Sequence, residues 1–181
     1  MKPFFTVHAG EYLVGNYIEK QYPDVNLWIP SKDTGIDLLV TNSDNTRAIS
    51  LQVKFSKDFT YDKHPDIQRG IQSLGWFTLM DKKIAESKAD LWIFTLFSFS
   101  ERINHFLIIP PKILLKRLRE IHGRRERIQT YFWVTNKGKC WEARGLKKSD
   151  EILIANHVFK SKKRDFTKHL NNWQLLEQGR K

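Results

Sequence analysis

The sequence feature that most constrains the fold is a short alternating segment, AISLQVKFS, at residues 48–56. Apolar residues occupy every second position in its second half, and Gln52 and Lys54 stand between them. Successive side chains of a β-strand point to opposite faces of the sheet. The segment therefore predicts a strand that buries its apolar side chains and presents Gln52 and Lys54 together on the other face.

The residues before this strand predict a β-hairpin in which Asp37 faces Gln52. Asp37 lies in the apolar run IDLLVT, which itself predicts a strand and is followed by the turn-like NSDNT. A four-residue loop would pair Asn42 with Arg47. That register places Asp37 directly opposite Gln52, with Cβ atoms roughly 5 Å apart, and Lys54 on the diagonal. Because a buried carboxylate without a partner is costly, Asp37 needs a group of this kind near it.

Residues 89–99 are apolar on both alternating faces, as expected of a strand covered on both sides of its sheet. A crossover from the 48–56 strand to this strand implies a parallel pair with right-handed connection. The fold class is therefore α/β, with a mixed central sheet flanked by helices in a single domain spanning residues 1–181. The other predicted elements are a helix over 8–21, strands over 26–30 and 36–41, a helical segment from Pro65 to about Lys88 interrupted at Gly70 and Gly75, a strand over 104–109, a helix over 111–122, a hairpin over 130–143 and a closing helix.

The charge of the chain favours a polyanionic partner. The formal net charge is +11, and the pI is about 9.8. Residues 1–90 have a net charge of −1, whereas residues 91–181 have a net charge of +12. Nucleic acid is the first candidate partner and an acidic membrane surface the second. No run of residues is apolar and long enough to span a bilayer, so no membrane insertion is expected. The single cysteine, Cys140, excludes an internal disulfide and fits a cytoplasmic setting.

Glu11 adds a second carboxylate to the predicted site. On the 8–21 helix it precedes Val14 by three residues and Ile18 by seven, so it borders the apolar stripe that faces the sheet. A carboxylate aimed at a sheet that already carries Asp37 is repelled unless a cation lies between them. Hard cations such as Mg²⁺ bind oxygen ligands, which carboxylates and an amide oxygen supply.

The order of these residues resembles the PD-(D/E)XK nuclease superfamily. GID, ending at Asp37, is followed after fourteen residues by QVK, from Gln52 to Lys54, and an acid lies in the preceding helix. The resemblance is closest to the branch with Mrr-like restriction nucleases and archaeal-type Holliday junction resolvases. It implies a restriction endonuclease-like core of αβββαβ order over about residues 8–109, with a basic C-terminal extension over about 110–181.

The resemblance also implies a role for each residue. Asp37 corresponds to the metal-binding aspartate, Lys54 to the motif lysine and Glu11 to the helix acid. Gln52 stands where most members carry Glu or Asp, which removes one negative charge and should weaken metal binding. The metal, Mg²⁺ or Mn²⁺, would be held by Asp37, the Gln52 amide oxygen, the Val53 carbonyl and Glu11.

The predicted function is therefore that of a Mg²⁺-dependent DNA endonuclease of restriction, repair or junction-processing type. A homodimer is expected, because cutting two strands needs two sites. Two alternatives remain: a non-catalytic DNA-binding protein that keeps the fold but has lost function at Gln52, and an RNA-binding or RNA-processing module. Asp37 could also form a structural salt bridge with Lys54 and hold no metal. The candidate DNA contacts are the basic residues Lys57, Arg69, Arg117, Arg124, Arg125, Lys162, Lys163 and Arg164.

Overall fold

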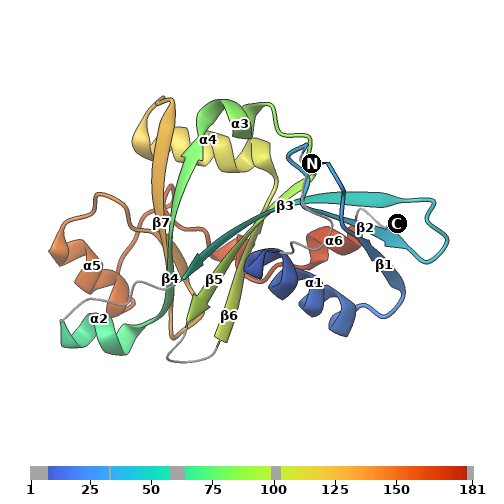
Figure 1. Cartoon of the computed structure of the whole chain (residues 1–181). Helices are drawn as coiled ribbons and strands as arrows, with labels where there is room; N and C mark the ends of the chain where they lie inside the picture. Colours follow the sequence, from blue (N-terminus) through green and yellow to red (C-terminus); the bar gives the residue numbers. More distant parts are fainter. Residues whose placement is uncertain (1–7, 33, 58–63, 99–102, 179–181) are drawn as a thin grey trace.

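The computed structural model describes residues 8–32, 34–57, 64–98 and 103–178 (Figure 1). Its elements in chain order are α1 (Ala9–Gln21), β1 (Val25–Trp28), β2 (Leu38–Asn42), β3 (Ala48–Lys57), α2 (Pro65–Gly70), β4 (Ile71–Met80), α3 (Asp81–Ala85), β5 (Leu91–Ser98), β6 (Ile103–Ile109), α4 (Pro111–His122), β7 (Arg127–Thr135), β8 (Cys140–Glu142), α5 (Lys148–Ala155), the 3₁₀ helix η1 (Thr167–His169) and α6 (Gln174–Gln178). None of the helices in these described ranges has the length and apolar character needed to cross a membrane.

The first sheet is mixed and has the strand order β1-β2-β3-β5-β6. β3 and β5 are parallel, as predicted, and the other neighbours are antiparallel. The β2–β3 register is also the predicted one, since Leu38 pairs with Leu51 and Thr41 with Ala48. The α/β class with a mixed sheet flanked by helices is thus confirmed.

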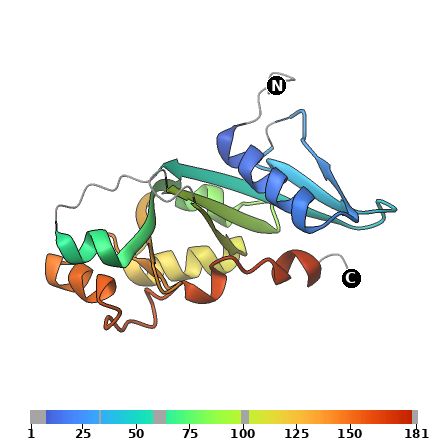
Figure 2. The same cartoon turned by 90° about the horizontal axis from the view of Figure 1, so that it is seen from below.

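β5 is buried on both faces, because it lies between two apolar layers. Phe94 and Leu96 pack in a cluster that includes α4, β4 and β7. On the opposite face, Leu91 and Ile93 pack in a cluster that includes α1 and α6. The predicted strand buried on both faces is confirmed over residues 91–98, and Figure 2 shows α1 and α6 beside the first sheet.

The second sheet, β4-β7-β8, corrects the prediction of a helical segment from Pro65 to about Lys88. Only α2 and α3 are helical there, and β4 lies between them. In its second half buried and less buried side chains alternate, with Phe77 and Leu79 buried and Thr78 exposed, whereas Leu74 is buried in a different apolar cluster. Glycines at 70 and 75 disfavour a continuous helix, and the strand finds its partner in β7.

The predicted core and extension share this second sheet, since β4 comes from residues 8–109 and β7 and β8 from residues 110–181. The predicted helix over 111–122 and the hairpin of β7 and β8 are both confirmed. Buried Cys140 of β8 joins the same apolar cluster as β5 and α4. The last part of the chain also supports the first sheet, because Trp173 and Leu176 pack in the cluster that contains α1.

Candidate active site

Asp37 lies directly before β2 and faces Gln52, as the hairpin register predicted. Its backbone N–H donates to the Leu51 carbonyl at 2.8 Å. Its carboxylate Oδ2 accepts hydrogen bonds from the Val53 backbone N–H, at 2.8 Å, and from the Gln52 amide Nε2. Asp37 is 6% exposed and Gln52 8% exposed. The buried carboxylate therefore receives the polar partners that its burial requires.

The pairing between β2 and β3 ends at Leu38, one residue after Asp37 in the chain. This explains why the Asp37 side chain can reach the β3 backbone. The N–H and C=O of one strand residue point toward the same neighbouring strand. Those of Val53 point to the β2 side, but β2 begins at Leu38, which pairs with Leu51. The Asp37 side chain takes the place of the missing strand residue. The Val53 carbonyl therefore points to the same side of β3 as the Asp37 carboxylate.

The Gln52 amide is held between Asp37 and the loop before β2. Its Nε2 faces Asp37, and its Oε1 lies 3.7 Å from the point where a Cβ on Gly35 would stand. Gly35 has φ of +81°, a conformation that L side chains rarely adopt. This explains the glycine of the GID motif, because the turn brings the loop over the amide. The O and N positions of such an amide follow from its hydrogen bonds, so an ion at Asp37 would require the amide to turn its oxygen inward.

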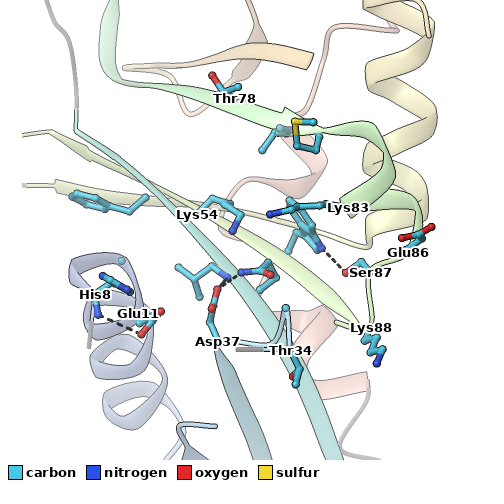
Figure 3. Close-up of a pocket in the computed structure, with 18 of the residues that line it drawn as sticks. His8, Glu11, Thr34, Asp37, Lys54, Thr78, Lys83, Glu86, Ser87 and Lys88 are labelled. Carbon is cyan, nitrogen blue, oxygen red and sulfur yellow. Dashed lines mark hydrogen bonds between the residues drawn. The ribbon is translucent and has the colours of Figure 1, made fainter. Parts of the chain in front are cut away.

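Glu11 is 4% exposed and belongs to the helix that packs on β3. The approach is close, since a Cβ on Gly10 would stand 2.7 Å from the Cβ of Phe55. The Glu11 Oε2 accepts from the His8 backbone N–H at 3.3 Å, which is a helix-capping contact. Figure 3 shows the Glu11 carboxylate directed from α1 toward Asp37. Glu11 thus caps the helix and also faces the predicted site.

Lys54 occupies the same face of β3 as Gln52 and is half-buried. Its Nζ lies 5.5 Å from the centroid of the Trp92 ring, in the range of a cation–π contact. The Trp92 Nε1 in turn donates to the Ser87 Oγ at 2.8 Å. The ring is therefore fixed, and it limits where the ammonium group can lie.

These residues line one pocket of about 1040 Å³. Figure 3 shows Lys54 from β3 and Lys83 from α3 directed into it from opposite sides. One wall of the pocket, supplied by β4, α3 and the following loop, was not predicted from the sequence. The lining residues of that wall are Thr78, Leu79, Met80, Lys83, Glu86, Ser87 and Lys88. The only sequence signal for them was the lysine density of residues 82–88, which by itself is typical of any solvated helix.

The donor atoms of the site suit a hard divalent cation. Asp37 and Glu11 supply carboxylates, and Val53 supplies a peptide carbonyl on the same side of β3 as Asp37. Gln52 supplies an amide oxygen once its amide group is turned. Mg²⁺ and Mn²⁺ favour oxygen donors and are commonly held by only one or two protein carboxylates. Among the residues that the structure describes, no three His, Cys, Asp or Glu side chains gather as a metal site. A cation here would thus depend on the amide and the carbonyl as well as on the two acids.

Two of the predicted DNA contacts are taken up by contacts inside the chain. The Arg117 Nη2 donates to three backbone carbonyls, of which that of Asp165 is nearest at 2.6 Å, and its guanidinium lies 4.3 Å from the Phe166 ring centroid. Arg164 forms an ion pair of 2.6 Å with the fully buried Glu142. Both side chains therefore contribute to the fold, and their contact with DNA stays a prediction.

The other candidate DNA contacts do not form one cluster around the pocket. Arg69 lies on α2 and pairs with Asp66 at 2.8 Å. Arg124 and Arg125 are exposed between α4 and β7, and Lys162 and Lys163 are exposed in the loop before η1. The side chain of Lys57 lies outside the described residues. None of these described residues lines the pocket that holds Asp37 and Lys54.

Comparisons with models of known protein families, with curated proteins and with solved structures find no match to this chain.

Gly10→Ala is expected to disturb the site through the α1–β3 contact. The added methyl group would stand 2.7 Å from the Cβ of Phe55 and 3.2 Å from Val53 Cγ1, so α1 must shift. We expect a loss of about 1–3 kcal/mol in the free energy of unfolding, as for other overpacked contacts. Urea unfolding measures this change. The control Glu19→Ala, at an exposed position of the same helix, should change stability by no more than about 0.5 kcal/mol. Equal stability of the two variants would contradict the close packing.

Proposed function

We propose that this protein is a metal-dependent DNA endonuclease with a restriction endonuclease-like arrangement of its first sheet. The observation that carries the proposal is the gathering of Glu11, Asp37, Gln52 and Lys54 in one pocket. The element order supports it too, since a helix, a β-hairpin and a parallel strand reached by a crossover are what the PD-(D/E)XK resemblance implies. The β4 strand within the crossover is an addition to the αβββαβ order.

The chain's own residues suit the hydrolysis of a phosphodiester. Asp37, Glu11, the Gln52 oxygen and the Val53 carbonyl would hold Mg²⁺ or Mn²⁺. A bound ion of this kind lowers the pKa of water and offsets charge on the phosphoryl oxygens. The Lys54 ammonium, directed into the same pocket, orients a water molecule and stabilises the charge that develops on the phosphate. Lys83 on the opposite side attracts the DNA backbone.

Asp37→Asn tests the proposal directly. The asparagine keeps the size of the side chain and an oxygen to accept from the Val53 N–H, but it lacks the charge that holds a divalent ion. We expect the wild-type protein to nick supercoiled plasmid in Mg²⁺ or Mn²⁺ and not in EDTA, and Asp37→Asn to lose this activity. Asp24→Asn, at an exposed position outside the pocket, is the matched control and should cut as the wild type does. Cleavage by Asp37→Asn at the wild-type rate would refute the assignment.

Gln52→Glu is expected to strengthen divalent-ion binding and weaken the ion-free protein. The new carboxylate would face Asp37 in place of a donor, so repulsion should lower the melting temperature in EDTA. A bound cation would offset that repulsion, and we expect at least about tenfold tighter Mn²⁺ binding by calorimetry. Gln68→Glu, at an exposed position of α2, provides the same charge change away from the site. Unchanged Mn²⁺ affinity in Gln52→Glu would indicate that no ion binds beside residue 52.

A non-catalytic DNA-binding protein is the second candidate, and one contact favours it. The Gln52 amide donates to Asp37, so the pair satisfies itself without an ion. In that case calorimetry would detect no Mg²⁺ or Mn²⁺ binding that depends on Asp37, while DNA binding would persist in EDTA.

A further inference from the structure

A second pocket, of about 540 Å³, lies at the second sheet where α4 ends and β7 begins. Arginine is its most frequent lining residue: Arg125, Arg127, Arg144 and Arg164 all contribute. We refer to it as the arginine pocket. Guanidinium groups present several N–H donors in one plane, which matches the oxygens of a phosphate.

The residues that the structure describes balance the positive charge of the arginine pocket only in part. Glu142 lies fully buried beneath it and pairs with Arg164 at 2.6 Å and with the His122 Nε2 at 3.1 Å. Among the described residues that line the pocket, none is acidic. Three further guanidinium groups thus surround a space where their repulsion would be relieved by an anion.

Two of the four guanidinium groups are already held in place. Arg144 lies 4.7 Å from the Trp76 ring centroid and donates to the Gln129 Oε1 at 3.1 Å. Arg164 is fixed by Glu142. An arginine that is already ordered loses less conformational freedom when it binds a phosphate. These two guanidinium groups are therefore pre-organised to bind an anion.

The arginine pocket lies one strand away from the candidate active site. Thr78 and Met80 of β4 line the active-site pocket. Their cross-strand partners on β7 are Gln129 and Arg127, which line the arginine pocket. Such partners lie side by side on one face of a sheet, with Cβ atoms roughly 5 Å apart. A single nucleic-acid strand, with its closely spaced phosphates, is long enough to reach both pockets.

We propose that the arginine pocket binds a backbone phosphate of the DNA whose neighbouring phosphodiester enters the candidate active site. The proposal rests on the proposed function and adds a second anchoring point for the substrate. This contact is sequence-independent, because a phosphate carries no base information. It positions the DNA relative to Lys54 and Asp37.

The double variant Arg125→Gln with Arg127→Gln tests the arginine pocket. Both side chains are exposed, so the fold should tolerate the change. Duplex DNA binding is measured in EDTA by fluorescence anisotropy over a series of KCl concentrations. We expect about tenfold weaker binding and a slope of log affinity against log salt that is smaller by about 0.9, the loss of one phosphate contact. Arg47→Gln, beside the β2–β3 turn, removes one positive charge elsewhere and should leave the slope unchanged.

The outcomes separate this proposal from the proposed function. Wild-type affinity and slope in the double variant would overturn the arginine pocket, even if Asp37→Asn abolishes cleavage. Reduced affinity and slope in a protein that never cuts DNA would support the pocket and refute the endonuclease. A titration with inorganic phosphate, followed by thermal shift, shows whether the pocket binds a free phosphate ion instead of a phosphate of DNA. Loss of phosphate binding without any change for duplex DNA would also overturn the proposal.

Discussion

Replacing Lys54 by alanine is expected to slow Mg²⁺-dependent plasmid nicking by about 10²–10⁴-fold, the usual effect of removing a group that transfers protons or stabilises transition-state charge. Lys54 is half-buried over Trp92, and its ammonium shares the pocket with Asp37 and Glu11. DNA retention on a native gel should stay within about twofold, because one phosphate contact of many is changed. The comparison of nicking rate with retention therefore isolates the chemical step.

Lys20→Ala is the matched control for this variant, since Lys20 is exposed at the end of α1. It removes the same charge without touching the pocket and should cut at the wild-type rate. An equal loss of nicking in both variants would mean that net charge matters and that the position of Lys54 does not. Normal nicking by Lys54→Ala would remove this lysine from the mechanism.

Arg164→Ala is expected to lower the free energy of unfolding by about 3–5 kcal/mol, because it leaves a buried carboxylate without its main partner. Glu142 is fully buried, and the Arg164 guanidinium lies 2.6 Å from its Oε2. The other oxygen, Oε1, keeps the Arg144 backbone N–H at 3.1 Å. We therefore attribute the expected loss mainly to Oε2, which loses its ion-pair partner. Urea denaturation measures the change in the free energy of unfolding.

A second substitution separates charge pairing from general packing. Adding Glu142→Gln to Arg164→Ala removes the unpaired charge and should recover part of the lost stability, which a double-mutant cycle quantifies. Lys163→Ala, at the exposed neighbouring position, should change stability by no more than about 0.5 kcal/mol. If Arg164→Ala proves as mild as Lys163→Ala, Glu142 does not depend on this ion pair.

The β2–β3 hairpin was predictable because its signals are local. Alternating apolar residues give the second strand and an apolar run gives the first. A four-residue loop over 43–46 then sets the register that brings Asp37 opposite Gln52. Glu11 was placed by helical periodicity in the same way. In each case the deciding residues lie within a few positions of each other or on one regular element.

The second sheet was not predictable by the same means. β4 pairs with β7, which lies more than forty residues further along the chain. No local pattern in residues 71–80 indicates which strand is the partner. The internal contacts of Arg117 and Arg164 were not predicted, for a related reason. A basic run does not reveal which of its members faces a buried carboxylate or a backbone carbonyl, since that depends on tertiary packing.

The interleaving of the two sheets has a consequence for how the protein is made. β4 cannot pair until β7 has been synthesised. The first sheet also lacks part of its apolar cover until Trp173 and Leu176 have been synthesised. A growing chain on the ribosome therefore exposes unpaired strand edges and apolar surface until nearly all of these residues have emerged. Such nascent chains are natural clients for chaperones that shield apolar segments during synthesis.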